Sequence, residues 1–186
     1  MQKSQTIHRT KTLDLTYMAV CAALMAICSW ISIPATVPFT LQTFAVFLTV
    51  ILLGGRRGTI TILVYILMGA VGIPVFAQFT GGVGILLGST GGYIVGFLFT
   101  ALIMWGMEKL LGRKAWALIL SMLFGLIACY AFGTAWYMIF YAGTPDAVGL
   151  LTALGWCVFP FVLPDLIKIG LALTLGTQLR KAIRYD

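Results

Sequence analysis

The sequence predicts an all-α integral membrane protein with six transmembrane helices and both termini in the cytoplasm. Of the 186 residues, 61% are hydrophobic and 9% are charged, whereas a soluble domain averages about 45–50% apolar and about 25% charged residues. The mean hydropathy of +1.04 points the same way. Basic residues gather in small groups between the apolar segments. We therefore expect a single multi-pass domain over residues 1–186, in the cytoplasmic membrane.

Proline and glycine bound the first three predicted helices. A helical span needs about 20 mostly apolar residues. After a polar tail over about 1–14, the first apolar segment covers about 15–33; a span of this length is interpreted as a retained helix rather than a signal peptide. The second and third segments, about 41–53 and 59–73, are short. The glycine- and arginine-rich turn between them nevertheless favours a helical hairpin.

A glycine-rich segment without helical periodicity, about 74–89, separates the first three helices from the last three. The remaining helices are expected over about 90–111, 115–141 and 150–179. We expect the last one to be interrupted near Pro160 or Pro164, because proline removes a helical hydrogen bond.

The charge distribution supports this count. Six helices with a cytoplasmic N-terminus place eleven of the twelve basic residues on the inner side: Lys3, Arg9, Lys11, Arg56, Arg57, Lys109, Arg113, Lys114, Arg180, Lys181 and Arg184. The outer loops near 34–40, 74–89 and 142–149 contain no lysine or arginine. This pattern follows the positive-inside rule, and it explains the net charge of +7 without a nucleic-acid partner.

No metal ion, cofactor or enzymatic activity is expected. The cysteines at 21, 28, 129 and 157 lie within apolar segments without metal-ligand spacing, and the one histidine, His8, is in the N-terminal tail. Buried thiols acting as small hydrophobic side chains explain this pattern.

Asp165 and Lys168 are the ionisable residues that topology does not explain. Lys168 precedes Arg180 by twelve residues, about 18 Å along a helix, too far for its side chain to reach the inner surface. A charge at this depth costs at least about 2.5–3.5 kcal/mol and needs a partner or a wet cavity. At i and i+3 the two side chains share a helix face. If a helix restarts at Pro164, Asp165 lies at its positive end.

Two interpretations of this pair stay open, a ligand site and a structural salt bridge. A buried ion pair contributes little net stability compared with apolar residues, which favours a ligand in a cavity that opens outward. The glycine-rich segment would then form a wall or lid, with Gln78, Phe79 and Tyr93 offering polar and stacking contacts. A purely structural loop is the alternative. A phosphate-binding loop is excluded because the required lysine is missing.

Small residues share one side of the first predicted helix. Ala19, Ala22, Ala23 and Ala26 recur at spacings of three and four, which lets another helix approach closely in lipid. The spacing fits docking of a partner subunit and packing within this chain equally well.

Four segments resemble the BioY family, the biotin-specific substrate-binding (S) components of energy-coupling-factor (ECF) transporters. They are VPFTLQTFAVFL (37–48), LLGGRRG (52–58), YILMGAVGIPVFAQFTGGVGILLGSTGGYIVGF (65–97) and PDLIK (164–168). The resemblance implies a six-helix protein that binds biotin near the outer face. It also implies partnership with a transmembrane coupling subunit, docked on the alanines of the first helix, and with two cytoplasmic ATPases.

By this resemblance, the expected biotin-binding residues are Gln42, Gln78, Phe79, Gly82, Thr90, Tyr93, Asp165 and Lys168. Asp165 can accept a ureido N–H, Lys168 suits either the carboxylate or the ureido oxygen, and Phe79 and Trp136 are expected against the thiophane ring. The alternative is a proton-coupled secondary transporter of a small carboxylate-bearing solute, with Asp165 as its proton site, although we find no inverted repeats. A homo-oligomer is also left open.

Overall fold

The chain is built almost entirely of helices. The structure is a computed structural model that describes residues 2–145 and 147–182; the side chains of 2–10 and 182, and so those of Lys3 and Arg9, lie outside the description, as does Arg184. In chain order the elements are α1 (Gln2–Trp30), β1 (Ser32–Ile33), β2 (Phe39–Thr40), α2 (Gln42–Leu53), α3 (Gly55–Ala70), η1 (Ala77–Phe79), α4 (Val83–Leu87), α5 (Gly91–Leu111), α6 (Ala115–Tyr141), α7 (Leu150–Cys157) and α8 (Phe159–Ala182).

Helix length and composition divide these elements into two groups. Within the described residues, four helical stretches are long and apolar enough to cross a membrane: Lys11–Trp30 of α1, α5, α6, and Phe159–Lys181 of α8. Helix α2 is apolar but has only 12 residues. Helix α3 has 16 residues and carries Arg56 and Arg57 in its first turn. The predicted second and third helices are therefore present as shorter helices; most of α2 is buried, whereas α3 exposes Ile60, Val64 and Leu67.

Several predicted boundaries differ from the observed ones. Helix α1 begins at Gln2, so the predicted polar tail is helical where it is described. It ends at Trp30, before the predicted boundary, because residues 32–33 pair antiparallel with residues 39–40, with Ser32 opposite Thr40. Two short helices, η1 and α4, lie in the segment predicted to be non-helical. Elements of two to five residues are too short to leave a periodic pattern.

The last predicted helix is broken at Val158, between α7 and α8. This break lies two residues before Pro160 and so near the first of the two predicted positions; Pro164 is not a break. Pro160 lies in the first turn of α8, where its missing N–H costs little, and Pro164 lies inside the helix. Asp165 is therefore not in the first turn. The prediction that the positive end of a restarted helix supports this carboxylate was wrong.

Close contact between α5 and α6 depends on glycine. A Cβ on Gly96 would lie 2.8 Å from the Sγ of Cys129, and a Cβ on Gly133 would lie 2.3 Å from the ring of Tyr93. Small residues allow two helix backbones to approach in this way where lipid supplies no hydrophobic drive between helices. The pair forms one wall of the bundle and carries Tyr93 and Tyr130.

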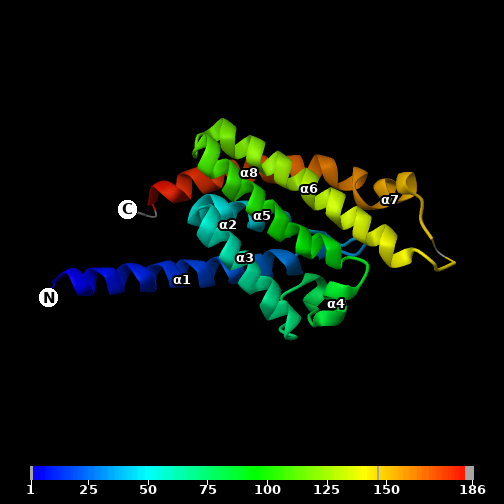
Figure 1. Cartoon of the computed structure of the whole chain (residues 1–186), viewed down its shortest axis with the longest axis horizontal. Coiled ribbons are helices and arrows are strands. Elements are labelled where there is room, and N and C mark those ends of the chain that lie inside the picture. Colours follow the sequence, from blue (N-terminus) through cyan, green and yellow to red (C-terminus); the bar gives the residue numbers. More distant parts are fainter. Residues whose placement is uncertain (1, 146, 183–186) are drawn as a thin grey trace.

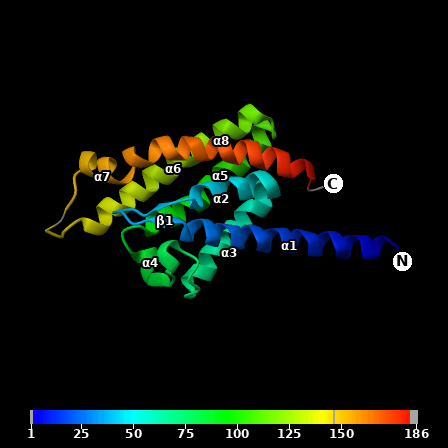
Figure 2. The same ribbon diagram turned by 180° about the vertical axis from the view of Figure 1, so that it is seen from behind.

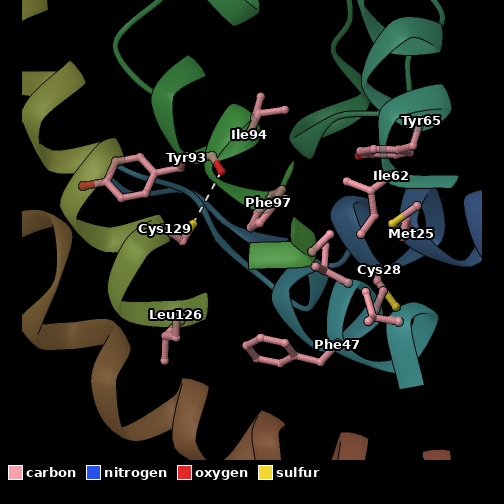
Figure 3. Packing of buried hydrophobic residues seen from close by; sticks show 14 of the residues in the cluster. Met25, Cys28, Phe47, Ile62, Tyr65, Tyr93, Ile94, Phe97, Leu126 and Cys129 are labelled. Atoms are coloured by element: carbon pink, nitrogen blue, oxygen red, sulfur yellow. Dashed lines mark hydrogen bonds between the residues drawn. The ribbon is translucent and has the colours of Figure 1, made fainter. Parts of the chain in front are cut away.

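The arrangement of the helices has two distinct ends. Figures 1 and 2 show that the start of α1, the end of α8, the α2–α3 turn and the α5–α6 turn lie towards one end. The β1–β2 hairpin, α4 and the α6–α7 connection lie towards the other. Figure 3 shows part of the core, where Met25 of α1, Phe47 of α2, Ile62 of α3 and Phe97 of α5 belong to one buried cluster.

Side chains from the end of α5 hold the junction between α2 and α3. At this junction Gly54 has a φ of 82°, a conformation that glycine adopts without strain. Glu108 Oε2 accepts the N–H of Gly55 at 2.6 Å, and Arg113 donates to the carbonyl of Ile51. Glu108 thus satisfies a backbone N–H at the start of α3, and Arg113 satisfies a backbone carbonyl at the end of α2.

Candidate functional site

A cavity of about 240 Å³ lies at the end of the molecule that carries the hairpin. Ligand sites typically enclose about 300–1,000 Å³, so this volume suits a small ligand. Its apolar lining includes Phe76, Phe97 and Phe161. Its polar lining comes from segments far apart in the sequence: Thr40, Gln42, Thr43, Gln78, Thr80, Thr90, Tyr93, Tyr130, Asp165 and Lys168.

Asp165 and Lys168 form the ion pair that their spacing allows. Lys168 Nζ lies 2.7 Å from Asp165 Oδ1, and the two residues are only 2% and 4% exposed. The ammonium also donates to the Thr40 carbonyl at 2.7 Å and lies 4.9 Å from the centre of the Phe39 ring. The carbonyl and the ring face lower the cost of desolvating the cation. The pair is thus buried, satisfied and open to the cavity.

Tyr130 of α6 holds the second oxygen of the carboxylate. Its hydroxyl donates to Asp165 Oδ2 at 2.5 Å, so each oxygen of Asp165 has a donor from a different element. Hydrogen bonds to an ionised group are stronger than those between neutral groups. The carboxylate is therefore fixed in orientation before a ligand arrives.

A second polar group enters the cavity from the start of α2. Gln42 is 4% exposed, and its Nε2 donates to Tyr65 Oη at 2.8 Å. Tyr65 in turn donates to the Val75 carbonyl at 2.6 Å, and so does Ser29, also at 2.6 Å. This network ties α1, α2 and α3 to the chain segment that continues into the cavity wall at Phe76.

The wall formed by η1 has unusual backbone geometry. Gln78 and Phe79 have φ values of 56° and 57°, in the left-handed region that bulky side chains rarely adopt. Such residues cost about 1–3 kcal/mol each and occur where the surrounding structure enforces them. The turn directs Gln78 to the rim of the cavity, whereas Phe79 points away and stacks on Trp30 at 4.9 Å between ring centroids.

A protein-family model described as the BioY family matches residues 1–185 of the chain. The chain belongs to the BioY family. The biotin transporter BioY of Thermotoga maritima is 40% identical over 160 residues, covering 86% of this chain and 90% of that protein. The biotin transporter BioY2 of Lactococcus lactis subsp. cremoris is 36% identical over 181 residues, covering 96% of each.

A solved structure has the same fold. The crystal structure of the S-component for biotin from an ECF-type ABC transporter aligns with a TM-score of 0.83 and 28% identity, covering 93% of both chains. This BioY family member is therefore a multi-pass membrane protein with the S-component fold, and it is a transporter component rather than an enzyme.

The fold brings together most of the residues expected at the site of this family member. Six of them line the cavity: Gln42, Gln78, Thr90, Tyr93, Asp165 and Lys168. Phe79 and Gly82 do not. Phe79 is 63% exposed, and the N–H of Gly82 bonds the Gly69 carbonyl at 2.6 Å, which anchors the loop on α3. Trp136 is also outside the lining, and its indole N–H donates to the Gly88 carbonyl at 2.9 Å.

The alanines expected at a docking surface are divided by the fold. Ala22 and Ala26 are 7% and 6% exposed and belong to the core cluster, so these two pack within the chain. Ala19 and Ala23 are exposed on α1. Only this pair remains available to a partner subunit.

Sequence reasoning missed several cavity residues. The hairpin contributes Thr40, and α6 contributes Tyr130, 35 positions before Asp165. A tyrosine within an apolar helix carries no signal of its own, because tyrosine also occurs at membrane surfaces. Phe161 was missable for the same reason, although its position one turn before Asp165 places it on the same face of α8.

Proposed function

We propose that this chain is the biotin-binding S component of an ECF transporter and that the cavity around Asp165 and Lys168 is its biotin site. The observation that carries the proposal is a fully buried ion pair opening into an otherwise largely apolar cavity. Biotin presents a ureido ring with N–H donors and a carbonyl acceptor beside an apolar thiophane ring. A carboxylate, an ammonium and aromatic walls complement these groups.

The proposal includes six membrane crossings with both termini in the cytoplasm. Outside the cavity, eight basic residues have described side chains, and they lie in α1 before its midpoint, at the α2–α3 turn, at the α5–α6 turn and at the end of α8, all towards the same end of the molecule: Lys11, Arg56, Arg57, Lys109, Arg113, Lys114, Arg180 and Lys181. The positive-inside rule assigns that end to the cytoplasm of the cell membrane. The cavity then opens outward, where biotin is encountered.

Active uptake requires partners, because the sequence holds no nucleotide-binding motif. We assign this role to a transmembrane coupling subunit and two cytoplasmic ATPases, with Ala19 and Ala23 of α1 at the contact with the coupling subunit. Their side chains are exposed and small, so another helix can approach closely.

Binding and uptake assays test the proposal separately. Isothermal titration calorimetry on the purified chain is expected to show biotin binding, and uptake in vesicles is expected only with the coupling subunit and the ATPases. Ala19→Trp or Ala23→Trp should abolish uptake and leave binding intact, whereas the control Ala131→Trp, at an exposed alanine of α6, should change neither. Absence of biotin binding refutes the function, and loss of binding in the α1 variants refutes the docking role.

A further inference from the structure

The side-chain amide of Gln42 lies between the cavity and a buried hydroxyl behind the cavity wall. Gln42 lines the cavity, and its Nε2 is 2.8 Å from Tyr65 Oη. Tyr65 is 1% exposed, belongs to α3 and is not part of the lining. Figure 3 shows it beside Ile62, within the core cluster. One end of the Gln42 amide therefore faces the buried Tyr65 hydroxyl, and the other end faces the cavity.

The partners of Tyr65 determine which end of the amide faces it. Tyr65 Oη lies 2.6 Å from the Val75 carbonyl, and a carbonyl can only accept, so the single phenolic hydrogen must lie between these two oxygens. Towards Gln42 the hydroxyl can then only accept. The amide nitrogen must face Tyr65, because an oxygen there would leave two acceptors in contact without a hydrogen.

The carbonyl of Gln42 is thereby left for the cavity. Among the described residues, no hydrogen bond reaches Oε1 of Gln42, while the side chain forms part of the lining. A donor lines the same cavity: Lys168 Nζ, which bonds the carbonyl of Thr40, two residues before Gln42, at 2.7 Å. The cavity thus presents an acceptor and a cationic donor.

We propose that Tyr65 is a positioning residue that sets the polarity of Gln42, so that the Gln42 carbonyl accepts an N–H group of the ligand. This inference rests on the proposed biotin site, and in biotin both N–H groups belong to the ureido ring. Tyr65 touches no ligand. It acts by excluding the flipped amide, which would offer the ligand a donor in place of an acceptor.

A double-mutant cycle tests the coupling between the two residues. Tyr65→Phe is expected to weaken biotin binding roughly five- to tenfold and Gln42→Met roughly tenfold or more. The double variant should bind as Gln42→Met does, within about twofold, because the hydroxyl acts only through the amide. Independent, multiplying losses would overturn the proposal, as would an unchanged affinity in Tyr65→Phe.

Two controls separate positioning from loosening of the wall. Ser29→Ala removes the other donor to the Val75 carbonyl but leaves the Tyr65–Gln42 contact. Tyr137→Phe removes a phenolic hydroxyl from a residue that is 3% exposed and outside this lining. Both should keep the wild-type affinity within about twofold. If Ser29→Ala matches the loss in Tyr65→Phe, Tyr65 only anchors the wall and the proposal fails.

A second comparison uses only variants of Gln42, so it shows which atom of the Gln42 amide faces the ligand even if Tyr65→Phe does not fold. In its protonated form, Gln42→Glu keeps a carbonyl oxygen towards the cavity and an O–H donor towards Tyr65, whereas Gln42→Met removes both polar atoms. Biotin should bind Gln42→Glu more tightly than Gln42→Met. The reverse order would mean that the amide nitrogen faces the ligand. Wild-type protein that binds no biotin refutes the proposed function itself, an outcome distinct from either order.

Discussion

The carboxylate of Asp165 shows how single residues build this site. Each of its oxygens receives a hydrogen bond, one from Lys168 on the same helix and one from Tyr130 on α6. Removing one member of such a group leaves an uncompensated charge or an unpaired acceptor in a buried place. Substituting either residue alone is therefore expected to destabilise the protein whether or not the pair binds a ligand. Only substitution of both residues distinguishes a ligand site from a structural salt bridge.

The prediction at this scale uses that paired change. Asp165→Asn and Lys168→Met should each weaken biotin binding roughly ten- to a hundredfold, since charge-assisted hydrogen bonds contribute about 1.5–3 kcal/mol. The double variant Asp165→Asn/Lys168→Met should fold, because no lone charge remains, and still fail to bind in calorimetry. A well-folded double variant with wild-type affinity would falsify the site assignment.

The matched control is an ion pair outside the cavity, between α1 and α3. Arg57 and Asp14 lie 2.5 Å apart with side chains 43% and 24% exposed, away from the cavity lining. Because exposed pairs contribute about 0–1 kcal/mol, Asp14→Asn/Arg57→Met should change neither folding nor biotin affinity measurably.

How far the sequence predicts this site depends on how local each contact is. The pairing of Asp165 with Lys168 follows from their spacing along one helix. Phe79 was expected in the cavity as an aromatic ring of the glycine-rich loop, but two successive left-handed residues turn it towards Trp30. Tyr130 reaches Asp165, and Thr40 reaches Lys168, only through tertiary structure. No local pattern encodes such contacts.

Among the elements, the pairing of α5 with α6 best illustrates what positions the cavity. Tyr93 and Tyr130 both line it, and their distance depends on how closely the two helices approach. The sequence predicts a face of small residues only on the first helix, where alanine dominates. The glycines at 96, 125 and 133 make the tighter contact, but on isolated helices glycine spacing does not reveal which face meets which partner.

Substitution of Gly96 tests this contact. A Cβ there would meet Cys129 Sγ at 2.8 Å and its Cα at 3.2 Å, so Gly96→Val should cost about 1–3 kcal/mol through overpacking. The matched variant Gly106→Val lies on the same helix, where nothing lies within 4 Å. Thermal unfolding in detergent should show a lower midpoint for the first variant only. Equal midpoints would show that the helices tolerate separation at Gly96.

At the scale of the whole molecule, the basic residues and the cavity lie at opposite ends of the helical bundle. The end that carries the described basic residues also carries the α2–α3 junction, where Glu108 and Arg113 satisfy a free amide and a free carbonyl. The opposite end holds the hairpin, the strained turn and the mouth of the cavity. Hydropathy and charge suffice to predict this polarity, whereas the short helices and the hairpin depend on contacts that composition does not record.

Cysteine labelling tests the proposed orientation. The four native cysteines are buried, so the background with membrane-impermeant maleimide should be low in intact cells. Ala147→Cys, in the exposed α6–α7 connection, should react from outside. Lys114→Cys, exposed in the α5–α6 turn, should react only after permeabilisation. The reverse accessibility would contradict the proposed orientation.

The contacts of Lys168 limit what kind of acceptor the cavity can take. An ammonium carries three N–H bonds, and two of them already point to the Asp165 carboxylate and the Thr40 carbonyl. One vacancy remains. A lone carbonyl oxygen, such as that of a urea, can accept the third N–H, whereas a carboxylate that takes two N–H bonds must displace either the Thr40 carbonyl or the Asp165 carboxylate. By this count of donors, we expect Lys168 to meet the ureido carbonyl in the proposed biotin site and the acid tail to bind elsewhere in the cavity.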